Sequence, residues 1–127
     1  MIACARQGGV VNINGVGMFL GKDGGGRPDN STQTLLRHID YAAQLIGPAH
    51  VGLGLDYVFD LSEMDELLKK DAAKFPLQSK DLAAYTQVEP ERFPAIAEGL
   101  LHLGYSEADA QGILGHNNLR VARTVWR

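Results

Sequence analysis

A short alternation of apolar residues with glycines constrains the fold of this chain more than any other feature. It lies within His50–Asp60, HVGLGLDYVFD, and has the period-two pattern of a β-strand: Val51, Gly52, Leu53, Gly54 and Leu55. The two glycines leave room for a neighbouring backbone or helix to approach closely. Asp56 follows the last apolar residue. An acid at the carboxyl end of a parallel strand is a candidate for catalysis, and the alternative is a carboxylate that only caps a turn.

A second strand and a helix precede this stretch. Val10, Val11 and Ile13 predict a brief strand that ends at Asn14-Gly15. A helix is predicted to begin after Asn30-Ser31 and to stop at Gly47-Pro48, with a buried stripe at helical spacing: Leu35, Ile39, Ala42 and Ile46. The order strand, helix, strand predicts a crossover unit that joins two parallel strands. Asn14 would then point toward the same edge as Asp56, and this makes it a second site candidate, weaker than Asp56.

The loop from Gly15 to Asn30 is rich in glycine and raises the question of phosphate binding. A P-loop that ends in Gly21-Lys22 would need glycine at position 16 and serine or threonine at position 23, but the chain has Val16 and Asp23. We therefore do not expect nucleotide binding.

The second half of the chain predicts further helices. Ser62 is expected to cap one helix, Pro94 to open the next, and Ser106 with Asp109 to form a capping box before Gly115 ends a third. Among the apolar residues expected to pack in these helices are Leu101, Leu119 and Trp126, and Trp126 is expected to be a packing anchor.

Composition limits the class of protein. A chain of 127 residues that is 45% hydrophobic predicts one globular domain. The net charge of -3 and the lack of a basic run argue against a nucleic-acid partner, and no apolar run is long enough to predict a membrane span. With Cys4 as its single cysteine and no apolar signal core before Val11, we expect a cytoplasmic location.

Two strands make an incomplete sheet. Both would be edges with unpaired backbone groups, and their helices would lack a full surface to cover. The sequence therefore predicts that further strands come from a partner chain or from a larger α/β domain.

Three motifs resemble the C-terminal part of the membrane (renal) dipeptidase family of zinc peptidases. They are the HIDY helix that leads into the glycine-punctuated strand with its terminal Asp56, the helix that ends in LGYSEAD, and the closing ILGHNNLRV. With GGVVNIN near the start, the likeness extends over nearly the whole chain. It implies an α/β fold, the C-terminal segment of a (β/α)₈ TIM-type barrel of a metal-dependent hydrolase, over residues 1–127.

The resemblance implies hydrolysis of dipeptides or related small amides by the complete barrel. In the family two zinc ions hold a bridging water, and their ligands come from earlier strands that have no counterpart here. The resemblance places Asp56 beside that water as the proton acceptor, with Tyr57 and Asn14 at the substrate. We expect this chain alone to bind no zinc and to be inactive. Its partners would be a dipeptide and the missing N-terminal segment or a partner chain, and homo-oligomerisation is left open.

This sequence departs from the family at the strand end. The family continues Gly-Asp-Phe-Asp-Gly, whereas this chain has Leu55-Asp56-Tyr57-Val58-Phe59-Asp60, so the loop over the substrate is expected to differ. His116 replaces a glycine before Asn117 and is expected to be a helix-cap or surface residue. The competing hypothesis is a non-catalytic interaction or structural remnant that keeps the packing of the barrel end and lacks the metal site.

Overall fold

The computed structural model describes residues 1–71, 73–74 and 86–126. Its sheet, within these residues, consists of β1 (Val11–Ile13) and β2 (Val51–Leu53). The strands are parallel, and Asn12 lies opposite Gly52. Helix α3 (Thr32–Ile46) connects them, which confirms the predicted strand, helix, strand unit. The described part is thus α/β, as expected, with a sheet of two strands.

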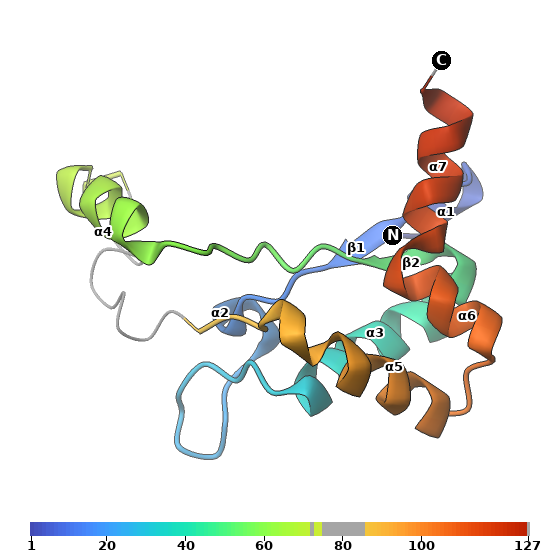
Figure 1. Ribbon diagram of the computed structural model, residues 1–127, viewed down its shortest axis with the longest axis horizontal. Helices are drawn as coiled ribbons and strands as arrows, with labels where there is room; N and C mark the ends of the chain where they lie inside the picture. The colour runs from blue at the N-terminus through green and yellow to red at the C-terminus, as the bar shows by residue number, and fades with distance from the viewer. Residues whose placement is uncertain (72, 75–85, 127) are drawn as a thin grey trace.

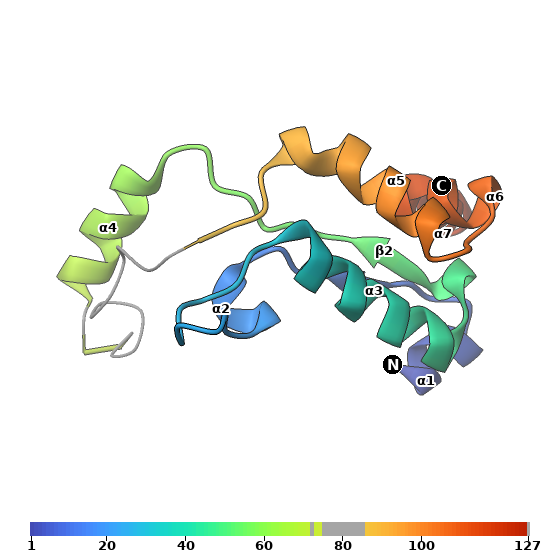
Figure 2. The ribbon, with the colours of Figure 1, turned by 90° about the horizontal axis from the view of Figure 1, so that it is seen from below.

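The remaining elements are mostly short. The helices are α1 (Ile2–Arg6), α2 (Gly17–Leu20), α4 (Leu61–Lys70), α5 (Phe93–His102), α6 (Glu107–Gln111) and α7 (Asn117–Val125), and the tighter or wider turns are η1 (Pro48–His50), η3 (Pro90–Arg92) and the π-helical η4 (Gly112–His116). Figures 1 and 2 show α4 at the end of an extended arm, apart from α3, α5 and β2. None of the helices in the described ranges is long and apolar enough to cross a membrane.

One hydrophobic core forms between α3, α5, β2 and η4. The largest fully buried side chains are Leu35, Ile39, Ile96, Leu100, Ile113, Val16, Val51 and Val88. Helices α3 and α5 approach closely where Gly99 faces Leu36, because a Cβ at Gly99 would overlap the Leu36 side chain. The alternation predicted for the strand is confirmed on this face, since Val51 and Leu55 are buried.

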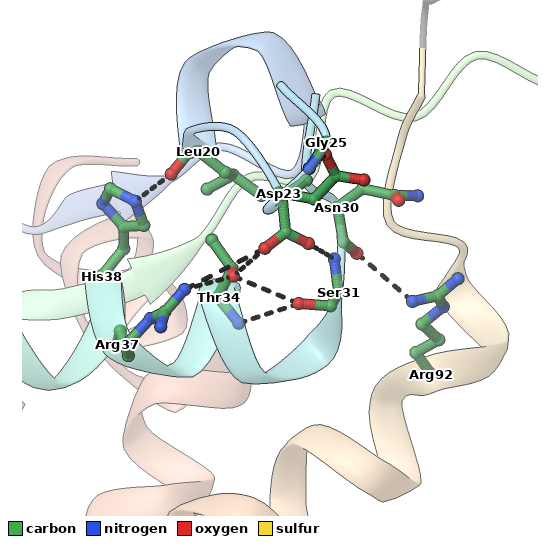
Figure 3. Close-up of polar contacts among 10 residues, drawn as sticks. Leu20, Asp23, Gly25, Asn30, Ser31, Thr34, Arg37, His38 and Arg92 are labelled. Atoms are coloured by element: carbon green, nitrogen blue, oxygen red, sulfur yellow. Dashed lines mark hydrogen bonds and ion pairs between the residues drawn. The ribbon is translucent and has the colours of Figure 1, made fainter. Parts of the chain in front are cut away.

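The N-terminus of α3 is capped as the sequence predicts. The Ser31 hydroxyl accepts a hydrogen bond from the Thr34 amide at 3.2 Å, and the Asp29 carboxylate accepts one from the Ser31 amide at 2.9 Å. The Thr34 hydroxyl donates to Asp29, and the Arg37 guanidinium lies 4.0 Å from the same carboxylate. Figure 3 shows Ser31, Thr34 and Arg37 close together at this end of α3. The bond from Thr34 is the largest cause that lowers the pKa of Asp29 below its ordinary value, followed by the bonds from Ser31.

Removing the Thr34 hydroxyl should therefore raise the pKa of Asp29. In Thr34→Val we expect the carboxyl to titrate closer to its ordinary range, measured by ¹³C NMR. A lowered pKa contributes stability that is present above the unfolded pKa and is lost as pH falls through the folded pKa. The stability deficit of the variant should thus be largest near neutral pH and shrink at acid pH. Thr124→Val, which removes an exposed hydroxyl on α7, is the control, and an equal pKa shift there would contradict this assignment.

Several expectations for the later helices are wrong. Helix α4 begins at Leu61, and the carboxylate that accepts from the Ser62 amide, at 2.9 Å, is that of Asp60, so Asp60 and not Ser62 caps the helix. Trp126 lies just beyond α7 and is 80% exposed, so it is no packing anchor in this chain. Leu101 and Leu119 are also exposed, because α5 buries Ile96 and Leu100 instead, and the residue that α7 buries is Asn117.

The glycine at the centre of β2 has a packing role. A Cβ at Gly52 would overlap the Oδ1 of Asn12 and lie 2.9 Å from the Nδ2 of Asn118, which confirms that another element approaches the strand closely there. The Nδ2 of Asn118 donates to the Oδ1 of Asn12 at 3.0 Å, and replacing Gly52 by alanine would force this pair apart.

We expect Gly52→Ala to lower the free energy of unfolding by about 1–3 kcal/mol, the usual cost of overpacking. Urea unfolding followed by circular dichroism measures this difference. Gly24→Ala is the matched control, because its Cβ would meet no atom within 4 Å, and it should change stability by less than about 0.5 kcal/mol. Equal costs at both positions would refute the close approach at Gly52.

Candidate functional site

The two polar residues that follow the strands meet at one edge of the sheet. The Nδ2 of Asn14 donates to the Oδ2 of Asp56 at 3.3 Å, although the residues are separated by 42 positions. Backbone bonds carry the strand pairing out to this point: the Gly54 amide donates to the Ile13 carbonyl at 3.1 Å and the Gly15 amide to the Leu55 carbonyl at 3.1 Å. The structure thus brings Asn14 and Asp56 together at the carboxyl ends of parallel strands, where open α/β sheets bind ligands.

The backbone of Asp56 and the amide of Asn14 set the geometry of this pair. Asp56 has a φ of 57°, and among the described residues it is the one non-glycine with a positive φ. Aspartate and asparagine tolerate this left-handed conformation better than most residues. The Oδ1 of Asn14 accepts from the Val16 amide at 2.6 Å, which turns the Nδ2 toward the carboxylate. The Asp56 side chain itself is exposed, so it is accessible to water or a ligand.

The predicted substrate residue Tyr57 is half-buried and packs against the core. Its ring lies edge-to-face with Phe59, with a centroid distance of 5.0 Å and an interplanar angle of 89°. Phe59 is 90% exposed, so it presents more apolar surface beside the site than Tyr57 does. Phe59 could not be singled out from the sequence, because nothing in a single aromatic residue after a strand distinguishes a surface position from a core position.

A third segment, Thr86–Val88, lies against the residues that follow each strand: Gly15 and Gly17 after β1, and Val58 after β2. The amide of Gly17 donates to the Thr86 carbonyl at 2.8 Å, and the amide of Val88 donates to the Gly15 carbonyl at 2.9 Å. The side chain of Gln87 pairs with the backbone of Val58. Gln87 was missed because the stretch around it has no periodic pattern; part of the predicted irregular region 75–90 lies outside the described residues.

The opposite ends of the strands are held by the motif Asn117–Arg120, NNLR. Asn117 is buried and its Nδ2 donates to the carbonyls of Pro48 and Val51, both at 2.8 Å. The guanidinium of Arg120 donates to the carbonyls of Gly8 at 2.8 Å and Ala49 at 3.0 Å. This polar clamp, as we call these bonds of Asn117 and Arg120, holds the segments that enter β1 and β2.

The described residues do not fit a metal pair. No three His, Cys, Asp or Glu side chains in the described part of the chain gather as a metal site would require. His38 pairs with the Leu20 carbonyl at 2.6 Å, and His50 pairs with the Gly9 carbonyl at 2.9 Å. His116 is exposed, as predicted for a surface residue.

A hollow of about 590 Å³ lies beside η4 and α7. Its lining residues include Leu114, Leu119, Ala122 and Trp126, and none of the candidate site residues. The exposed apolar side chains of α7 thus gather away from Asp56.

Comparison with known proteins decides the family. Residues 1–89 match the model of membrane dipeptidases, peptidase family M19. The chain belongs to this family. The match includes Asn14, Asp56 and Gln87, and it ends before α5 begins.

Two relatives extend the comparison. An uncharacterised protein encoded in the 5′ region of pqqA in Klebsiella pneumoniae is 31% identical over 125 residues, which are 98% of this chain and 38% of that protein. Dipeptidase 3 of Rattus norvegicus is 28% identical over 95 residues, 75% of this chain and 15% of that protein. The chain therefore spans well under half the length of these relatives. No solved structure gave a significant match.

The Asn14–Asp56 contact can be tested by charge. In Asn14→Asp the new carboxylate can still accept from the Val16 amide, but it faces Asp56 with a like charge. We expect the melting temperature to fall by about 2–4 °C at pH 7, and the loss to shrink on acidification, because the repulsion needs both carboxylates to be charged. Asn14→Ala adds no charge and should show a loss that varies little with pH. The same pH dependence in both variants would contradict the contact.

Proposed function

We propose that this chain supplies the C-terminal part of a zinc-dependent dipeptidase barrel, in which Asp56 accepts a proton from the water that attacks the peptide carbonyl. The observation that carries the proposal is the meeting of Asp56 and Asn14 at the carboxyl ends of two parallel strands, 3.3 Å apart, in a chain of the membrane dipeptidase family. Catalytic groups of TIM barrels lie at this end of the strands. The substrate would be a dipeptide or a related small amide.

The chemistry of the pair suits proton transfer. The carboxylate of Asp56 is exposed, so it can reach a water above the strand ends, and the neutral amide of Asn14 fixes one of its oxygens by donating to it. A positioned carboxylate that takes a proton in the transition state typically contributes about 10²–10⁴-fold to the rate. Tyr57 and Phe59 would border the substrate on the side that follows β2.

The zinc ions of the family must be held by residues other than those described here, because this part of the chain has no set of three ligands. We propose that these ligands belong to the further length that the relatives possess and this chain does not span. That length would come from a longer polypeptide or from a partner chain. The competing hypothesis is a non-catalytic remnant of a dipeptidase barrel, and it predicts that the completed protein hydrolyses no dipeptide.

The test compares the chain alone with the chain completed by the missing portion, sought in the coding sequence upstream of Met1 and in neighbouring genes. We expect the 127-residue chain alone to show no dipeptidase activity with zinc added. The completed protein should hydrolyse dipeptides, as followed by release of free amino acids. A completed protein that folds, binds zinc and hydrolyses none would support the remnant instead.

In the completed protein, Asp56→Asn should lower kcat at least about 100-fold, because asparagine keeps the left-handed backbone but cannot accept the proton. The matched control is Asp60→Asn, four residues further on. Asparagine can still cap α4 there, so kcat should change little. Comparable losses in the two variants would remove Asp56 from its proposed role.

A further inference from the structure

The side-chain amide of Gln87 makes a two-way contact with one backbone unit beside the site. Its Oε1 accepts from the Val58 amide at 2.9 Å, and its Nε2 donates to the Val58 carbonyl at 2.9 Å. The side-chain amide of Gln87 therefore forms the same pair of hydrogen bonds with Val58 that the backbone of a neighbouring β-strand would form. Among side chains, only asparagine and glutamine carry both a carbonyl acceptor and an amide donor in this arrangement.

Gln87 is itself held from several sides. Its main-chain carbonyl accepts from the Asn30 side chain at 2.6 Å, and the main-chain carbonyl of Asn30 accepts from Arg92 at 3.2 Å, a bond seen at the right of Figure 3. Gln87 also forms an antiparallel bridge with Val16. The next residue, Val88, is completely buried in the core. These contacts fix the backbone of Gln87, and so its side-chain amide is held in place beside Val58.

These bonds enclose Asp56. On one side the carbonyl of Leu55 accepts from the Gly15 amide at 3.1 Å, and on the other side Gln87 holds Val58. Asp56 lies between the two anchored residues in its left-handed conformation, which is unfavourable without support from its surroundings. Because the side chain of Asp56 is exposed, its own packing does little to fix it, and the anchors on either side set its direction.

We propose that Gln87 is a positioning residue, which fixes the turn Asp56–Val58 so that the carboxylate of Asp56 meets the amide of Asn14 at the strand ends. The catalytic meaning of this arrangement rests on the proposed function. The positioning itself is a property of the 127-residue chain and can be tested without activity.

The first experiment uses ¹⁵N NMR of the full chain with Gln87→Ala, Gln87→Glu and the control Gln111→Ala, which truncates an exposed glutamine on α6. In Gln87→Ala the Val58 amide should exchange its hydrogen about two- to tenfold faster, the effect of losing one ordinary hydrogen bond. The side-chain NH₂ signals of Asn14 should shift as its contact with Asp56 loosens. Protection of core amides in α3 and α5 should stay unchanged. If Gln87 served only the overall stability of the fold, its loss would lower the protection of these core amides as well.

Gln87→Glu keeps the length of the side chain and the acceptor for the Val58 amide but cannot donate to the Val58 carbonyl at neutral pH. It should retain more protection at Val58 than Gln87→Ala, and it decides the question if the alanine variant fails to fold. Unchanged Val58 and Asn14 signals in a folded Gln87 variant would overturn the proposal. So would a loss of protection spread equally over Val58 and the core.

The second experiment concerns catalysis in the completed protein. Gln87→Ala should lower kcat by about tenfold or more with a smaller change in KM, because misplacing a reacting group by a fraction of an ångström affects the chemical step more than binding. Wild-type protein without dipeptidase activity would defeat the proposed function, while the NMR result would still judge the positioning. A shifted Asn14 signal with unchanged kcat would show that the positioning has no catalytic effect and would overturn that part of the inference.

Discussion

The parallel pairing of β1 with β2 is the interaction on which the rest of this structure depends. It is only three residues long on each strand, yet it aligns the segments that follow the strands as well as those that precede them. At one end it brings Asn14 to Asp56, and at the other it places the carbonyls of Gly8 and Ala49 within reach of Arg120. A shift of register by one residue would exchange the core and solvent faces of the strand and separate both sets of partners.

The two ends of this strand pair are stabilised differently. The end that precedes the strands is held by a buried asparagine and by an arginine that spans two carbonyls, so its geometry is fixed by several bonds from a single helix. The end that follows the strands relies on Gln87 and on an exposed carboxylate in a left-handed conformation. This division resembles the general separation of stability and chemistry between the two faces of a barrel.

Local signals in the sequence predicted the elements that carry their own start and stop residues. Ser31 and Gly47 bounded α3, the alternation around Gly52 predicted β2, and Ser106 predicted the cap of α6, which accepts from Asp109 at 3.1 Å. Asp56 and Asn14 could be nominated because parallel strands present their carboxyl ends at one edge. That their side chains touch was not predictable, since it depends on the left-handed turn at Asp56.

The features that sequence reasoning missed depend on the path and packing of the chain, which neighbouring residues do not reveal. Gln87 pairs with Val58, 29 positions away, and no pattern in the residues around Gln87 predicts this pairing. Asp60 and Ser62 are both good capping residues, and only the path of the arm before α4 decides between them. Trp126 was expected in the core because of its size, but the short α7 contacts the rest of the protein through the polar side chains of Asn117, Asn118 and Arg120 instead.

The polar clamp has a consequence for how this protein can vary. Within the described residues, Asn117 and Arg120 bind four carbonyl groups of the main chain and no side chain, so the clamp recognises the path of the backbone and not the identity of the residues. Ala49 is therefore open to substitution as long as the chain follows the same course, whereas the φ of 81° at Gly8 favours glycine there. Asparagine and arginine have no such freedom. In a set of related sequences, we would expect the motif NNLR to tolerate change at its third position, Leu119, and the residue at the position of Ala49 to vary.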